Sequence, residues 1–345
     1  MTILSRLVRA AFCFDGTLLT KNHRRSGTNN DLALYSSPDL SNDGWTLENP
    51  SLVPADQRPN GIYFRPKMLW NEPTEKFVLW FNFVTETRND TVTCSAAVHW
   101  PRMNFTSPFC HSTYGTATST NVEGPFGSLK LPIVMGSSKL AGRPGHSHGD
   151  FNVFVEDDED RSAYVLYNSY DAGPRANNAI DLLSADYTES TLKTSGYMMA
   201  AKHGAEAQAM IKRRGRYFVL LSAGCCFCAE GSSTKVLSAT KDILNETSWN
   251  PTTTGKLGIN GAVPRTIAAQ QSFIIQLPDV GQREQWLWGG DRWHSGNKIE
   301  NGGVHNAARN QSQGYKSADA MVWVSAELPL ILSRSTCAVH AGFLF

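Results

Sequence analysis

Residues 150–167 read DFNVFVEDDEDRSAYVLY, and this stretch contains the pattern that decides the fold. A polar residue, Asp150, precedes a short apolar run at 151–155. An acidic turn follows at 156–162, and an aromatic-Val-Leu-aromatic run comes next at 164–167. Short runs of β-branched and aromatic residues bounded by turn residues are typical of β-strands. The stretch therefore predicts a β-hairpin whose first strand begins with a polar side chain.

The same pattern occurs four times along the chain. The four leading polar residues, which are 85, 56 and 64 positions apart, are Arg65, Asp150, Glu206 and Gln270. The 28 Gly and 16 Pro residues fit many turns between short strands. Repetition at this spacing predicts one four-stranded sheet per repeat. Such sheets repeated around an axis form a β-propeller, which avoids long exposed edges.

The ends of the chain supply the remaining strands of the predicted ring. Segments 15–19 and 32–35 would open a first blade that is shortened and atypical, and segment 321–324 would close the ring. We therefore expect an all-β, five-bladed β-propeller in a single domain over 1–345, with its core at about 31–330. An ordinary β-sandwich with coincidental spacing is the alternative.

Composition narrows the classes of partner. Lys and Arg total 32, Asp and Glu total 31, and the net charge is +1. A nearly neutral chain has no long-range field that would gather nucleic acid or an anionic membrane. The sequence also has no run of eighteen apolar residues, the length that a membrane-spanning helix needs. We expect a monomer, with neither nucleic acid nor a membrane as its partner.

Two features of the sequence bear on the cellular location of the protein. Arg6 and Arg9 interrupt the apolar segment that a signal peptide would need at the N-terminus. Four Asn-x-Ser/Thr sequons favour secretion or the secretory pathway, and they lie at Asn89, Asn104, Asn245 and Asn310.

Cysteine and histidine spacing gives little support for a metal site. The chain has seven cysteines, so at least one thiol is left over if the others pair within the chain. The cluster at 225–228 lacks the second Cys or His pair that a tetrahedral zinc site requires. His146 and His148 would share one face of a strand, but no third ligand is evident. We interpret both features as structural.

The four leading residues would meet if the propeller prediction holds. The innermost strand of each blade lines the central axis, so one polar residue per blade converges on a single pocket. Two carboxylates on separate strands are what glycoside hydrolysis needs, because one protonates the leaving oxygen while a second group activates water or attacks the sugar. A structural interpretation, in which these residues only hydrogen-bond one another across the channel, stays open.

Several segments resemble glycoside hydrolase family 43, and within it the exo-β-1,3-galactanase-like branch. In chain order they read YSSPDL at 35–40, RPK at 65–67, GPF at 124–126, DFNVFVEDD at 150–158, EAQAM at 206–210 and GDRW at 290–293. The match covers roughly 31–330. The resemblance implies a five-bladed propeller that cleaves a galactan-like polysaccharide with inversion. The Cys cluster at 225–228 is similar to a divergent eukaryotic set within this family.

The resemblance also implies roles for individual residues. Glu206 would be the general acid, with a pKa raised by burial and a neighbouring carboxylate. Asp150 would be that neighbour, and Gln270 would position the attacking water. The residues that would bind substrate or shape the pocket are Arg65, Asp291, Arg292 and Trp293. We expect no cofactor, although Ca²⁺ in the channel, as in some relatives, stays open.

The sequence departs from the galactanase pattern at several positions. Phe64 stands where the galactanases carry a Glu before Arg-Pro-Lys, and Gln208 stands where Pro is usual. Gln271 adds a second amide beside Gln270, and the first blade is short. The alternative to a hydrolase is therefore a catalytically inactive propeller that binds carbohydrate without cleaving it.

Overall fold

The computed structural model describes residues 13–15, 32–36, 46–85, 112–137, 148–169, 177–196, 205–223, 233–255, 270–280, 283–293 and 318–326. These residues form five antiparallel sheets, which confirms the all-β class. Five separate sheets differ from the two facing sheets of a sandwich. The described part of the chain contains no helix with the length and hydrophobicity that a bilayer span requires.

The strands follow one another in chain order within each sheet. Sheet 1 contains β1 (Cys13–Asp15), β2 (Leu32–Ser36) and β3 (Thr46–Asn49). Sheet 2 contains β4 (Gly61–Asn71), β5 (Lys76–Thr85), β6 (Ser112–Ser119) and β7 (Gly127–Ile133). Sheet 3 contains β8 (His148–Val155), β9 (Ala163–Ser169), β10 (Asn177–Leu183) and β11 (Ser190–Thr194). Sheet 4 contains β12 (Ala205–Arg213), β13 (Arg216–Ala223), β14 (Ser233–Ala239) and β15 (Asn250–Gly255). Sheet 5 contains β16 (Gln270–Val280), β17 (Arg283–Trp293) and β18 (Ala318–Ala326). Short 3-10 turns occur at Ala55–Gln57 and Glu246–Ser248.

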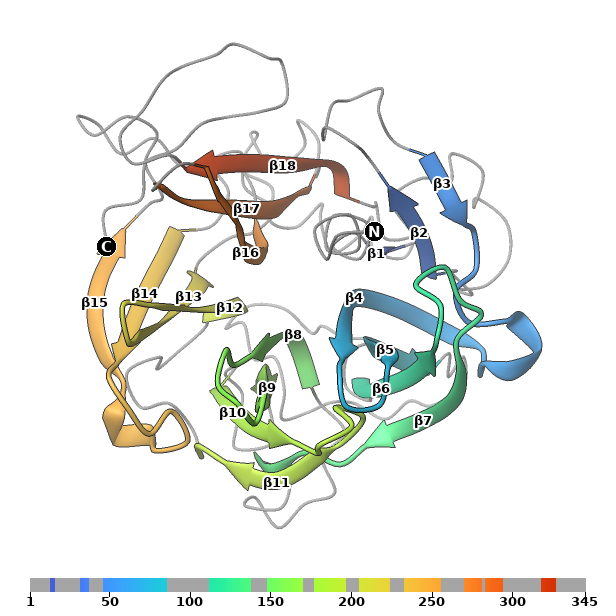
Figure 1. The fold of residues 1–345 in the computed structure, drawn as a ribbon, viewed down its shortest axis with the longest axis horizontal. Helices are drawn as coiled ribbons and strands as arrows, with labels where there is room; N and C mark the ends of the chain where they lie inside the picture. The colour runs from blue at the N-terminus through green and yellow to red at the C-terminus, as the bar shows by residue number, and fades with distance from the viewer. Residues whose placement is uncertain are drawn as a thin grey trace, which may run out of the picture.

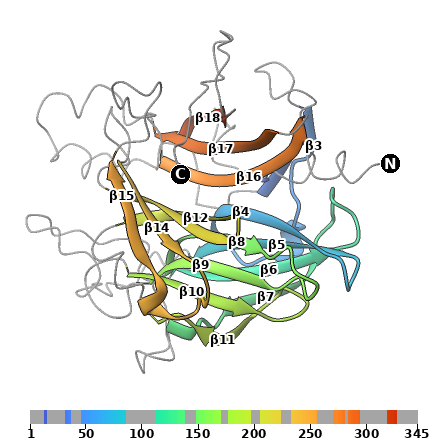
Figure 2. The same cartoon turned by 60° about the vertical axis from the view of Figure 1, so that its left-hand side comes forward.

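The sheets are arranged around a common centre (Figure 1). The first strands of sheets 2 to 5, which we call the inner strands, are β4, β8, β12 and β16, and they lie nearest that centre. The last strands of sheets 2, 3 and 4 lie at the periphery. Figure 2 brings sheet 4 forward and shows its outer strand β15 along the outside of the molecule.

Strand β5 shows why the apolar runs in the sequence are continuous. Its odd-numbered residues Phe77 and Leu79 belong to a buried cluster shared with β2 of sheet 1. Its even-numbered residues Val78 and Trp80 belong to another cluster shared with sheet 3. Because successive side chains of a strand point to opposite faces, a strand that is buried on both faces is apolar at nearly every position.

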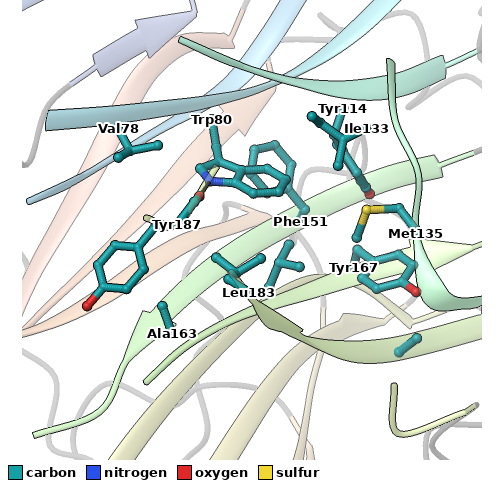
Figure 3. Packing of buried hydrophobic residues seen from close by; sticks show 12 residues of the cluster. Val78, Trp80, Tyr114, Ile133, Met135, Phe151, Ala163, Tyr167, Leu183 and Tyr187 are labelled. Carbon is teal, nitrogen blue, oxygen red and sulfur yellow. Dashed lines mark hydrogen bonds between the residues drawn. The ribbon is translucent and has the colours of Figure 1, made fainter. Parts of the chain in front are cut away.

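Apolar clusters also lie between sheets 1 and 2, between sheets 2 and 3 and between sheets 3 and 4, and a smaller cluster on sheet 4 packs against Ile274 of sheet 5. Figure 3 shows the cluster between sheets 2 and 3, where Trp80 packs against Phe151 with ring centroids 6.3 Å apart. The Trp80 indole Nε1 donates a hydrogen bond to the Tyr187 carbonyl at 2.7 Å. Each fully buried large apolar side chain contributes about 1.5–3 kcal/mol to stability, so these clusters hold the sheets side by side.

The four repeats of the sequence pattern are confirmed as hairpins. They correspond to β4–β5, β8–β9, β12–β13 and β16–β17, and each leading polar residue lies in the first strand of its pair. At the N-terminal end, segment 32–35 lies in β2 as expected and Asp15 ends β1 (Cys13–Asp15), whereas 16–19 lie outside the described residues. The C-terminal end differs from expectation. Segment 321–324 lies in β18, which pairs with β17 as the third strand of sheet 5.

The core between sheets 2 and 3 also encloses a carboxylate. Asp181 on β10 accepts hydrogen bonds from the Gly136 backbone nitrogen at 2.6 Å, the Tyr167 hydroxyl at 3.0 Å and the Ser190 hydroxyl at 2.7 Å. These donors stabilise the charged form, but burial outweighs them and raises the pKa of Asp181.

We predict that Asp181→Asn changes how the unfolding free energy depends on pH. A folded-state pKa above the unfolded value stabilises the protein below the unfolded pKa of about 3.9, and this stability is lost as the pH rises through the folded pKa. The stability of the wild type relative to Asp181→Asn should therefore fall as the pH rises through this window. Urea unfolding followed by tryptophan fluorescence measures both proteins.

Asp186→Asn is the matched control. Burial alone would raise the pKa of Asp186, but hydrogen bonds from Ser184 and Thr188 outweigh it, and the pKa is lowered. For this control the stability of the wild type relative to the variant should fall as the pH drops. A pH-independent difference for Asp181→Asn would contradict the account of its buried carboxyl.

Candidate functional site

Each inner strand contains one extra residue at the same level of the ring. The register shifts lie between Phe64 and Lys67 on β4, His148 and Phe151 on β8, Glu206 and Ala209 on β12, and Gln271 and Phe273 on β16. These are β-bulges, which re-aim side chains and are over-represented beside active sites. All four leading residues of the sequence pattern lie within a bulge or within one residue of it.

Two of these bulges contain a backbone conformation that side chains disfavour. Arg65 has φ 53° and Ala207 has φ 52°, and both residues carry a Cβ atom. Left-handed conformations of this kind cost about 1–3 kcal/mol and persist only where the surroundings hold them. The backbone is therefore held in place at the level of the candidate site.

Arg65, Asp150 and Gln270 form a closed triangle of hydrogen bonds. The Arg65 guanidinium binds the Asp150 carboxylate through Nε at 2.9 Å and Nη2 at 3.0 Å. The same Nη2 donates to Gln270 Oε1 at 2.7 Å, and Gln270 Nε2 donates to Asp150 Oδ2 at 3.2 Å. The triangle fixes the orientation of the Gln270 amide, since its oxygen faces the cation and its nitrogen faces the carboxylate.

This triangle is largely shielded from water. The side chains of Arg65 and Asp150 are 8% and 14% exposed, and Gln270 is 3% exposed. Arginine stays protonated at any physiological pH, and its planar fork matches a carboxylate in bidentate geometry. A charge so poorly hydrated needs its counter-ion, so Arg65 and Asp150 hold sheets 2 and 3 together at the axis.

A second polar layer lies two residues further along the same strands. Lys67 Nζ donates to the Ser272 carbonyl at 3.0 Å, and Asn152 Nδ2 donates at 3.0 Å to the carbonyls of both Gln208 and Ser272. This layer was not among the predicted site residues. The signal was available, because Lys67, Asn152, Gln208 and Ser272 each follow a leading residue by two positions.

The backbone before Asp150 is held by the neighbouring sheet. Asn82 Nδ2 of β5 donates to the carbonyls of His148 at 3.1 Å and Gly149 at 2.8 Å. The Tyr114 hydroxyl donates to the Gly149 carbonyl at 2.9 Å. Sheet 2 therefore supplies both the counter-ion of Asp150 and the groups that fix its backbone.

The structure describes the other predicted site residues in less detail. Glu206 lies at the bulge of β12, half-buried and opposite Ser222. On β17, Asp291 pairs with Gln270, and Arg292 and Trp293 follow it. The side chains of these last three residues lie outside the described part of the structure. The structure thus brings Arg65, Asp150 and Gln270 into direct contact, with Glu206 on the inner strand between β8 and β16.

The remaining motifs are placed as follows. In the described ranges, no group of three or more His, Cys, Asp or Glu residues could hold a metal ion. His148 is buried and stacks on Tyr114, with ring centroids 5.2 Å apart. His146 and the Cys cluster at 225–228 lie outside these ranges. Of the four sequons, Asn245 is described, and it is exposed.

Comparison with known proteins identifies the fold. No known family profile matches the sequence, and no curated protein matches it. An exo-β-1,3-galactanase from Clostridium thermocellum has TM-score 0.58 and 20% identity, over 91% of this chain and 55% of that one. An exo-β-1,3-galactanase from Phanerochaete chrysosporium, solved with galactose, has TM-score 0.52 and 22% identity, over 79% and 52%. A GH43 β-1,3-galactosidase, solved with galactodeoxynojirimycin, has TM-score 0.60 and 17% identity, over 96% and 94%.

The galactanase-like fold of glycoside hydrolase family 43, which the sequence motifs indicated, is thus confirmed. This chain spans about half the length of the two galactanases, with 55% and 52% covered, and nearly all of the galactosidase, with 94% covered.

We predict strong energetic coupling between Arg65 and Asp150. A double-mutant cycle with Arg65→Met and Asp150→Asn should give a coupling energy of about 2–3 kcal/mol in urea unfolding, because each single change leaves the other member of a buried ion pair without its counter-charge. The exposed pair Lys130 and Glu189, 3.3 Å apart and 39% and 55% exposed, is the control. Its cycle should give less than about 1 kcal/mol. Equal coupling in both cycles would contradict the buried character of the site.

Proposed function

We propose that this protein is a glycoside hydrolase that cleaves O-glycosidic bonds of a galactan-like polysaccharide. The observation that carries the proposal is the buried triangle of Arg65, Asp150 and Gln270 at the centre of a fold shared with exo-β-1,3-galactanases. A fixed amide beside a carboxylate, with Glu206 on the neighbouring inner strand, supplies the group types that hydrolysis needs. We infer exo action on β-1,3-linked galactose, with inversion.

The proposed architecture is a five-bladed β-propeller in one domain, 1–345, with sheets 1 to 5 as its blades. Sheet 1 is the shortened first blade, since its three strands have three, five and four residues. The inner strands then line a central pocket, and the bulges set the level at which their polar side chains meet.

In the proposed mechanism Glu206 is the general acid. Its proton passes to the glycosidic oxygen as the bond to the leaving sugar breaks, and one water adds to the anomeric carbon from the opposite face. The proton that this water loses passes to the solvent, and Glu206 regains a proton from the solvent before the next turnover. Gln270 positions that water, and its orientation is set by Arg65 Nη2 at 2.7 Å. We propose that Asp150, on the neighbouring inner strand, is the carboxylate that tunes and orients Glu206.

We propose that Asp291, Arg292 and Trp293, together with Arg65, contact the sugar or shape its pocket. The register supports this for Asp291, because it lies directly opposite Gln270. We further propose that the protein acts as a monomer without a cofactor. An exposed sequon at Asn245 supports secretion or the secretory pathway.

Two observations favour the second candidate function, a propeller that binds carbohydrate without cleaving it. Arg65 already donates to Asp150, Gln270 and the Gln271 carbonyl, so its guanidinium is engaged by the protein itself. Phe64 also precedes it where the galactanases carry a Glu.

We predict that Glu206→Gln lowers kcat on β-1,3-galactan by about 10²–10⁴-fold, because an amide cannot donate the proton that a general acid supplies. Sugar release and the anomeric form of the first product are followed by NMR, and Glu189→Gln is the control at an exposed glutamate. Product of inverted configuration from wild type, and its loss in Glu206→Gln alone, is the expected result. Binding of a glycan without any release by wild type would favour the binding function.

A further inference from the structure

The backbone on either side of Glu206 is held from both neighbouring sheets. The Ala205 carbonyl, just before Glu206, accepts hydrogen bonds from Asn168 Nδ2 at 3.0 Å and Asn178 Nδ2 at 3.1 Å, both on sheet 3. The Ala207 carbonyl, just after it, accepts from Gln271 Nε2 of sheet 5 at 2.8 Å. Figure 1 shows β12 between these two sheets. Three amide side chains therefore bind the carbonyl groups of the two residues on either side of Glu206.

Of these three residues, Gln271 also forms several further hydrogen bonds. It is 1% exposed, and its Nε2 also donates to the Leu220 carbonyl at 2.9 Å. Its Oε1 accepts from Trp288 Nε1 at 3.3 Å. Its backbone nitrogen donates to the hydroxyl of Ser222, the residue opposite Glu206, at 3.2 Å. Gln271 thus binds the strand pair that carries Glu206 at three points.

This anchoring coincides with the strained residue of β12. Ala207 is left-handed, with φ 52°, inside the bulge that follows Glu206. A residue with a Cβ stays in this region only where its surroundings over-determine it. The hydrogen bond from Gln271 to the Ala207 carbonyl meets that requirement, and a bulge held in this way fixes the direction of the neighbouring side chain.

The adjacent residues Gln270 and Gln271 therefore have different roles. Gln270 contacts the Arg65 and Asp150 side chains, whereas both ends of the Gln271 amide are bound to sheets 4 and 5. We propose that Gln271 is a positioning residue for the general acid: it fixes the bulge after Glu206 and thereby the direction of its carboxyl group. This inference rests on the proposed role of Glu206.

The first test is Gln271→Met, which keeps the length of the side chain and removes both N–H donors. We expect kcat to fall by about 10–100-fold with KM within about twofold, because an acid displaced by about 1 Å loses most of its effect on the chemical step. Asn71→Leu is the control: Asn71 is also fully buried and donates at 2.8 Å to the Ala185 carbonyl, but it lies at the end of β4 remote from Arg65. Its kcat should not change, although its Tm should fall.

A purely structural role would lower Tm in both variants and leave kcat unchanged in both, which would overturn the proposal. If Gln271→Met does not fold, Ala207→Gly/Gln271→Met replaces it, because glycine adopts the left-handed conformation without steric cost. The double variant should fold and still show the lower kcat.

Crystal structures separate this inference from the proposed function. If the wild type hydrolyses no glycan, the proposed function fails, but the position of the Glu206 carboxyl can still be measured. We expect Gln271→Met to displace that carboxyl and to release Ala207 from its left-handed conformation, with neither change in Asn71→Leu. An unmoved Glu206 in Gln271→Met would overturn the positioning role, whatever the activity of the wild type.

Discussion

The buried guanidinium of Arg65 is the constraint on which the centre of the molecule depends. A permanent charge that is 8% exposed must be matched by protein groups, and it is matched by Asp150 of sheet 3 and by Gln270 and the Gln271 carbonyl of sheet 5. These hydrogen bonds therefore join the inner strands β4, β8 and β16 at one level of the ring. The apolar clusters between the sheets hold the ring, and this polar centre, together with the layer of Lys67 and Asn152, aligns its inner strands.

The same level of the ring contains the irregular backbone. Each inner strand has its bulge there, and two bulges hold a left-handed residue, Arg65 and Ala207. Side chains of adjacent sheets support these segments: Asn82 and Tyr114 hold the backbone before Asp150, and Gln271 holds the backbone after Glu206. Rigid strands with locally strained, externally supported residues are a usual way to place groups for chemistry.

Much of this arrangement could be predicted from the sequence. The repeat pattern predicted the hairpins. Each repeat starts with a polar residue and continues with apolar runs, because strands buried on both faces are apolar at nearly every position. The convergence of Arg65, Asp150 and Gln270 followed from the repeat alone. The motifs that resemble family 43 then identified a fold that the solved structures confirm.

Other features could not be predicted because they depend on register and on long-range partners. A bulge shifts the two-residue alternation by one position, so the sequence does not show that Gln271 leaves the site and anchors β12. The pairing of segment 321–324 with β17 is set by the arrangement of whole sheets, not by local pattern. The positions of Lys67 and Asn152, two after a leading residue, were a signal in the sequence, but their hydrogen bonds join strands that lie far apart in the chain.

We propose that the inner strands build one sugar pocket around Arg65, Asp150, Glu206 and Gln270. The most direct measurement is a crystal structure of the Glu206→Gln variant with bound β-1,3-galactobiose. We predict density for the sugar at the triangle, with the glycosidic oxygen about 3 Å from the side chain at position 206 and a water on Gln270 at the opposite face of the ring. A sugar bound away from these residues, or a triangle that excludes it, would contradict the account.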